Sequence, residues 1–175
     1  MYRVVIGVIV CIGLMGMGSI GYSADVAKIG LVDFQKILEN SEAGKKAQSE
    51  INSKGKELEE DLKKRSIEIE EIKKKFERDA MVISREERDE RERDYRIKVG
   101  DFKSLQTKYT NNLKELEVKL IDVIKEDVMK IIEAVGKNEG YLLIMEKREA
   151  GVLYSPTTID ISDQVIREYN KKKQS

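Results

Sequence analysis

The chain has 175 residues, with 33 lysines or arginines, 33 aspartates or glutamates, no histidine and one cysteine. Catalytic bases, nucleophiles and Cys/His metal sites usually need histidine or cysteine, so the composition argues against an enzyme and predicts no cofactor and no metal site. The equal numbers of acids and bases also argue against a nucleic-acid ligand, which favours a clustered excess of positive charge.

Residues 1–23 have the composition of a cleaved secretory signal peptide. Arg3 is the only charged residue, and an apolar run covers residues 4–20. Small residues then occupy the −3 and −1 positions of a cleavage site after Ser23, and cleavage one residue later is the alternative. Cys11 lies in the apolar run and would leave with the signal. An uncleaved membrane anchor stays open as the rival interpretation, because the run approaches the length that spans a bilayer.

A strand and a short helix are predicted next. Residues 26–32 are mostly apolar and have polar neighbours, which is typical of a strand that is covered on both faces. Apolar side chains then recur with helical spacing from Phe34 to Leu38. Ser41 follows at a position where its side chain can cap the start of a new helix.

Residues 41–138 form a uniform segment that predicts an antiparallel helical hairpin. They contain no proline, cysteine or histidine and carry 24 basic and 24 acidic residues. Apolar residues recur at steps of three, four and seven, as in the seam of a coiled coil. The seam residues are Ile51, Leu58, Leu62, Ile69, Ile72 and Phe76 in the first half, and Tyr95, Phe102, Leu105, Tyr109, Leu116, Leu120, Ile124, Val128, Ile131 and Val135 in the second. Gly55, Arg65, Lys98 and Asn112 interrupt this seam, so we expect imperfect pairing.

The hairpin is predicted to turn at a tip near residues 80–84. The apolar period fails there, and Ser84 and Glu87 then match the S-x-x-E capping box of a helix start. We therefore expect one helix over about residues 42–80 and another over about residues 85–137. The second helix is longer, so its end is expected to enter a body at the base of the arm.

The C-terminal part predicts two strands and a helix. Residues 141–145 are expected to form one strand, and residues 152–154 a returning strand that Pro156 stops. Ser162 is placed to cap a last helix that continues through Tyr169.

The sequence therefore predicts an α+β fold with residues 1–23 as a signal peptide, residues 24–40 and 139–175 as a small body, and residues 41–138 as the arm. The body has roughly 54 residues, and cores of this size without disulfides or metals are usually completed by oligomerisation. The candidates for the oligomer-forming body are Val26, Ile29, Leu31, Leu142, Ile144, Val152 and Leu153.

Several motifs point to a known family. Near the N-terminus these are KIGLVD at 28–33, QK at 35–36, NS at 40–41 and AGKKA at 43–47. The others are ISREE at 83–87, YLLIM at 141–145, VLY at 152–154 and DISDQVI at 160–166. With these motifs, the chain resembles the Skp/OmpH family of periplasmic chaperones over the whole mature sequence.

The resemblance implies a homotrimer, in which three subunits jointly build a β body and three hairpins surround a cavity. It also implies an ATP-independent holding chaperone of the periplasm, which binds unfolded outer-membrane β-barrel proteins in that cavity and prevents their aggregation. A periplasmic scaffold that binds one folded partner through its coiled coil remains the alternative.

Candidate client contacts are the apolar and aromatic side chains of the outer arm. They are Phe76, Met81, Val82, Ile83, Tyr95 and Phe102. Well-known members of the family are strongly basic, whereas this mature chain is near neutral. Recruitment of clients by charge and peripheral contact with anionic lipid therefore stay open.

Overall fold

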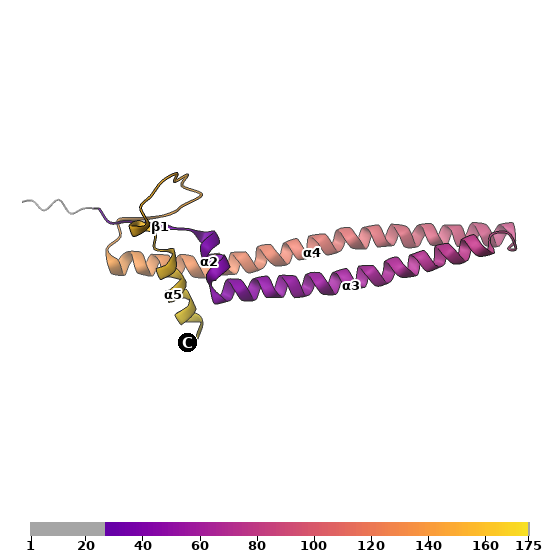
Figure 1. Ribbon diagram of the computed structural model, residues 1–175, viewed down its shortest axis with the longest axis horizontal. Helices are drawn as coiled ribbons and strands as arrows, with labels where there is room; N and C mark the ends of the chain where they lie inside the picture. The colour runs from indigo at the N-terminus through magenta and orange to yellow at the C-terminus, as the bar shows by residue number, and fades with distance from the viewer. Residues whose placement is uncertain (1–26, 175) are drawn as a thin grey trace, which may run out of the picture.

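The computed structural model describes residues 27–174 and shows a long two-helix arm attached to a small body (Figure 1). The elements in chain order are β1 (Ile29–Val32), α2 (Phe34–Asn40), α3 (Glu42–Asp79), α4 (Arg85–Glu139), β2 (Leu143–Glu146), the 3-10 helix η1 (Thr157–Ile159) and α5 (Ser162–Gln174). The predicted class, a helical hairpin on a small β body, is confirmed. The predicted signal peptide and Val26 lie outside the described residues, and completion of the body by trimerisation stays a prediction.

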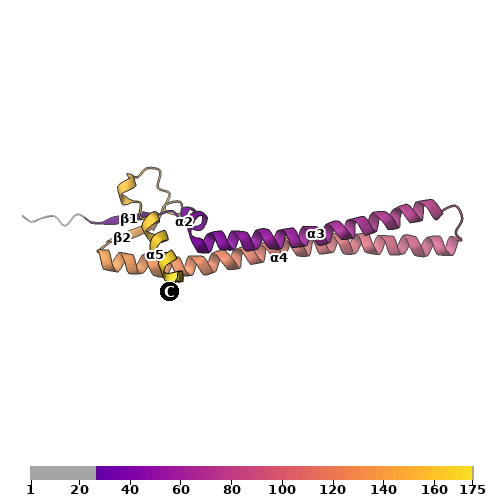
Figure 2. The same cartoon turned by 60° about the horizontal axis from the view of Figure 1, so that its bottom comes forward.

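The arm consists of α3 and α4, which run antiparallel and side by side in both views (Figure 2). Ser41 caps α3 as predicted, because its Oγ accepts a hydrogen bond from the backbone N–H of Gly44 at 3.1 Å. A glycine is required at position 44, since a Cβ there would lie 1.8 Å from the carbonyl oxygen of Leu38. The start of α3 is therefore held tightly against the end of α2.

Ser84 caps α4 at the tip, and its Oγ accepts a hydrogen bond from the backbone N–H of Glu87 at 3.2 Å. The side chain of Glu87 pairs with Arg91 and makes no hydrogen bond to the backbone of Ser84 in the structure, unlike the second half of a capping box. At its other end, α4 stops at Gly140, whose φ of 70° is favourable for glycine.

The two strands form a parallel pair in which Ile29 lies opposite Leu143 and Val32 lies opposite Glu146. Parallel neighbours need a long crossover connection, and here the entire arm is that connection. Both strands are shorter than predicted, and β2 begins two residues later than expected. Only a single isolated bridge, between Leu31 and Asp160, extends this sheet within residues 27–174.

The predicted returning strand at residues 152–154 is wrong, because these residues adopt no regular structure. After β2 the chain winds into helical turns, in which the backbone N–H of Val152 donates to the carbonyl of Lys147. The carboxylate of Glu146 holds these turns, because it accepts hydrogen bonds from the backbone N–H groups of Arg148 and Glu149 at 2.7 and 2.6 Å. The turn therefore directs the chain away from the free edge of β2.

The hydrophobic core lies where the base of α4 meets α2, β1 and α5. Its buried residues are Val32, Ile37, Ile124, Val128, Ile131, Val135, Ile161, Val165, Ile166 and Tyr169. The extra length of α4 thus enters the body, as the unequal helix lengths predicted.

Ser162 is the first residue of α5 and does not cap it as predicted. Its Oγ accepts a hydrogen bond from the backbone N–H of Asp33 at 2.8 Å, and its own N–H donates to Asp160. This serine joins the start of α5 to the end of β1, and α5 continues beyond Tyr169 to Gln174.

Candidate functional site

The tip of the arm presents two apolar side chains to solvent. Met81 is 94% exposed and Val82 is 84% exposed, whereas the third tip candidate, Ile83, is half-buried. The backbone N–H groups of Val82 and Ile83 both donate to the carbonyl of Asp79. The tip is therefore a hydrogen-bonded turn that displays an adaptable methionine next to a valine.

Ion pairs fix the two helices beneath this turn. The guanidinium of Arg91 on α4 contacts Asp79 at the end of α3 at 3.1 Å and Glu87 at 2.6 Å. Arg88 also donates to the carbonyl of Ala80. Hydrogen bonds from Arg78 and then from Arg91 lower the pKa of the Asp79 carboxyl, so it stays charged in neutral solution.

A second polar link crosses the arm nearer the body. The hydroxyl of Tyr109 on α4 donates to Oδ2 of Asp61 on α3 at 2.7 Å, and Arg65 donates to the same oxygen at 2.8 Å. The hydrogen bond from Arg65, followed by that from Tyr109, lowers the pKa of Asp61. No sequence pattern predicts this link, because the partners are 48 residues apart and meet only in the folded hairpin.

The remaining arm candidates lie on the seam. Phe76, Tyr95 and Phe102 are each half-buried at seam positions. They therefore contribute to helix pairing, and their contact with a client stays a prediction.

The body candidates divide into two groups. Leu31 is buried, while Ile144 and Val152 are half-buried. Ile29, Leu142 and Leu153 are exposed, and Leu153 reaches 101% of its reference exposure. The structure therefore buries Leu31, partly buries Ile144 and Val152, and leaves Ile29, Leu142 and Leu153 at its surface.

Other apolar side chains are exposed that were not among the candidates predicted from the sequence. They are Tyr154 and Leu143 in the body and Ile67, Ile97, Val118, Val123 and Met129 on the arm helices. Ile67, Ile97, Val118 and Met129 fall outside the heptad period of the seam, so their positions could have identified them. Val123 lies seven residues after the seam residue Leu116 and is exposed nevertheless.

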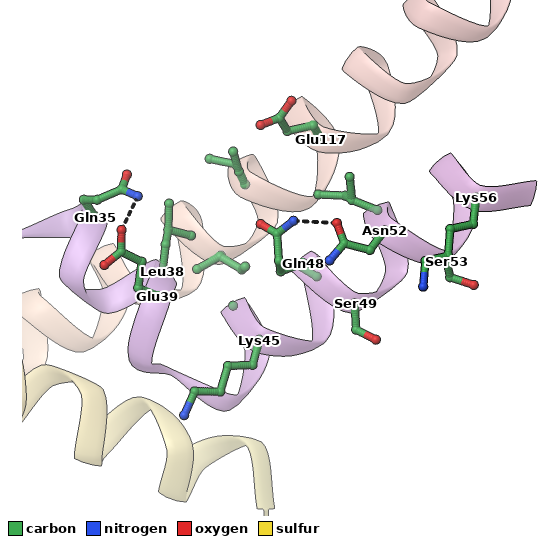
Figure 3. A pocket seen from close by; sticks show the side chains of 15 residues that line it. Gln35, Leu38, Glu39, Lys45, Gln48, Ser49, Asn52, Ser53, Lys56 and Glu117 are labelled. Atoms are coloured by element: carbon green, nitrogen blue, oxygen red, sulfur yellow. Dashed lines mark hydrogen bonds between the residues drawn. The ribbon is translucent and has the colours of Figure 1, made fainter. Parts of the chain in front are cut away.

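A groove at the base of the arm is lined by side chains from α2, α3 and α4 (Figure 3). Its amide groups pair within the groove, with Gln35 donating to Glu39 at 2.7 Å and Gln48 donating to Asn52 at 3.0 Å. Leu38, Ile51 and Ile121 supply apolar surface between them. These side chains offer a polar-rimmed surface and no nucleophile paired with a base.

Two further features of the described chain bear on function. Within residues 27–174, no three acidic side chains are grouped so that they could hold a metal ion. None of the helices described is both long enough and apolar enough to cross a lipid bilayer.

Comparisons with known proteins agree with this architecture. The family described as "Outer membrane protein (OmpH-like)" matches residues 28–169. A crystal structure of a protein from Caulobacter crescentus CB15, described as a "putative outer membrane chaperone (OmpH-like)", superposes with a TM-score of 0.78. The two sequences are 11% identical, and the match covers 84% of this chain and 86% of the other. A comparison with curated proteins finds no significant match.

The superposition shows that this structural relative shares the fold, and the family match extends from the first strand to the last helix. The chain belongs to the OmpH-like family.

Proposed function

We propose that the protein is an ATP-independent holding chaperone of the periplasm, which binds unfolded outer-membrane β-barrel proteins between the arms of a trimer. The observation that carries this proposal is the exposed Met81–Val82 pair at the tip of an OmpH-like arm. Unfolded barrel proteins expose apolar side chains, and such side chains are stabilised by contact with an adaptable apolar surface. The structural relative, described as a "putative outer membrane chaperone", supports the same class of function.

The charge pattern of the arm supports reversible binding of clients. Acid and base pairs such as Glu70 with Lys74 and Glu92 with Arg96 cover the helices between the exposed apolar residues. Each apolar contact with a client is therefore small and isolated. Several small contacts can retain an unfolded chain and still release it without nucleotide hydrolysis.

The surface of the body supports self-association. Leu142, Leu153 and Tyr154 are 73%, 101% and 86% exposed, although the body core is small. Parallel sheets are normally covered on both faces and have more than two strands. Among the described residues, β2 pairs only with β1, so its outer edge is open to a strand from a second copy of the chain.

The experiment that tests the proposal measures aggregation of several unrelated unfolded barrel proteins by light scattering, without nucleotide. The wild-type protein should suppress aggregation of all of them. Replacing Met81 and Val82 by serine should weaken this protection, while the matched pair Ile67→Ser and Ile97→Ser should weaken it less.

Unchanged protection by the tip variant would reject the tip as a contact site. Retention of one folded protein, without any suppression of aggregation, would favour the scaffold alternative.

A further inference from the structure

The groove at the base of the arm contains an apolar row and a polar row, which run side by side along α3. Ala47 and Ile51 are half-buried and form the apolar row. Gln48, Asn52 and Lys56 are exposed and form the polar row, in which they follow one another along the helix (Figure 3). Residues four apart lie on one face of a helix, so the groups in each row repeat about every 6 Å. The groove has a volume of about 750 Å³, which is enough for a short peptide segment.

The amides of the polar row keep hydrogen-bonding groups available. Gln48 donates to Oδ1 of Asn52, and within residues 27–174 neither Oε1 of Gln48 nor the amide nitrogen of Asn52 has a partner. An amide side chain offers the same kinds of donor and acceptor as a peptide bond. The polar row can therefore bind the backbone of an extended chain. These bonds would replace bonds to water, so they fix the register of the bound chain more than its affinity.

The apolar side of the groove continues from α3 to the neighbouring helices. Leu38 on α2 and Ile121 on α4 are half-buried and line the groove together with Ile51, and we call these three residues the apolar floor. Burial of apolar surface is the main favourable contribution to association. A matching ligand therefore brings apolar side chains to the apolar floor and polar side chains to the polar row.

An extended chain with alternating apolar and polar side chains meets these requirements. Successive side chains of a strand point to opposite faces, so those on one face repeat about every 6.6–6.8 Å. This repeat is close to the spacing of the rows on α3. The strands of membrane barrels alternate in this way, with apolar side chains toward lipid and polar ones toward the lumen. The apolar face of such a strand can cover the apolar floor while its polar side chains remain at the rim.

The charge of the groove also favours such a segment. The lining includes two lysines and two glutamates, which are Lys45, Lys56, Glu39 and Glu117. The groove therefore has no net charge and complements a segment that has none. An arm helix of a second copy would instead place acid and base pairs such as Glu70 and Lys74 against the apolar floor, where burial of charge is costly.

We propose that this groove binds an extended segment of the client in which apolar and polar side chains alternate. The proposal rests on the proposed function, because it names the part of the client that the base of the arm recognises. The groove holds one short segment, while the arms surround the rest of the client. Changes in the groove should therefore weaken recognition of this pattern more than the total protection of a client.

The experiment measures binding of two fluorescent peptides of about nine residues, roughly the length of a barrel strand that spans a membrane. In the first peptide, leucine alternates with threonine or glutamine. The second has the same composition, but its leucines are contiguous. By fluorescence anisotropy, the wild-type protein should bind the alternating peptide about fivefold more tightly, because the second peptide turns at least one leucine away from the apolar floor.

The groove variant replaces Gln48 and Asn52 by alanine, and both positions are exposed on the helix. It should weaken binding of the alternating peptide by about fivefold, as expected for the loss of about one hydrogen bond. The matched control replaces Gln106 and Asn112 by alanine. These are exposed amides on α4 that do not line the groove, so the control should leave the affinity unchanged.

Photo-cross-linking locates the bound peptide. A photoactivatable leucine in the alternating peptide should label residues 45–56 of α3 and residues 117–124 of α4. Equal affinity for the two peptides, equal weakening by the two variants, or labelling of the tip alone would overturn the proposal. A lower oligomer mass of the groove variant would also overturn it, since the groove would then bind a second copy of the chain.

The result can be separated from that of the proposed function. Suppression of aggregation of full-length barrel proteins, without peptide binding at the groove, would reject the groove site alone. Peptide binding at the groove without suppression of aggregation would reject the chaperone function and retain the groove as a peptide-binding site.

Discussion

The hydroxyl of Tyr169 is buried in the body without a hydrogen-bond partner in the described structure, and the residue is only 1% exposed. Its ring packs in the core, while Lys173 passes over it and pairs with Asp127 at 2.8 Å. Burial raises the pKa of the Tyr169 hydroxyl, so it stays protonated. The residue is held by the packing of its ring, and its hydroxyl contributes no hydrogen bond in the single chain.

Tyr169→Phe should therefore leave the free energy of unfolding unchanged or raise it by up to about 1 kcal/mol, because it removes an unsatisfied polar group. Tyr109→Phe is the matched comparison, since it deletes a hydroxyl that does bind Asp61. It should speed amide exchange in the arm. Denaturant titration checks the prediction for Tyr169→Phe, and amide exchange checks that for Tyr109→Phe. A clear loss of stability in Tyr169→Phe would reveal a partner for the hydroxyl in the assembled protein.

The link through Asp61 also predicts a pH dependence. Because the folded pKa of Asp61 is lowered, its contribution to stability is complete above the ordinary value of about 3.9 and is lost as pH falls through the folded pKa. The protection factor of the amides near Tyr109, which compares their exchange rate with the intrinsic rate at the same pH, should therefore fall below about pH 4 in the wild type. Asp61→Asn should remove this change, and an unaltered pH profile in that variant would contradict the assignment.

At the scale of elements, the helices of the arm were predictable because their signals are local. Ser41, Ser84 and Gly140 mark the helix ends through contacts within a few residues, and the seam repeats along each helix. The structure confirms these features. The seam period also ends before the tip, which agrees with Phe76 being half-buried on the seam and Met81 being exposed beyond it.

The elements that depend on contacts distant in sequence were predicted less well. Residues 152–154 have the composition of a strand, but Glu146 binds the following backbone N–H groups and directs the chain away from the sheet. Ser162 resembles a helix cap, but its hydroxyl binds the N–H of Asp33, which is 129 residues away. A local pattern does not specify which of two competing partners a polar side chain will bind.

At the scale of the whole molecule, assembly should depend on side chains that the single chain leaves exposed. Replacing Leu153 and Tyr154 by serine removes apolar groups that contribute little to the fold of one chain. The variant should therefore keep its helical content and lose oligomer mass in sedimentation at several concentrations.

Ile37→Ala is the contrasting change, because Ile37 is fully buried in the core of one chain. It should lower the free energy of unfolding by about 2–5 kcal/mol. A Leu153 and Tyr154 variant that keeps the full oligomer mass would show that these side chains do not form the interface.

The central claim is that the arms of an assembled protein hold the client. Deleting Ile69 through Asp101 and joining Glu68 to Phe102 through a short glycine turn removes the tip and the outer arm but retains the Tyr109–Asp61 link and the body core. Oligomer mass and suppression of barrel-protein aggregation are then measured on the same sample. The account predicts an intact trimer that has lost most of its protection, and undiminished protection by this shortened trimer would contradict it.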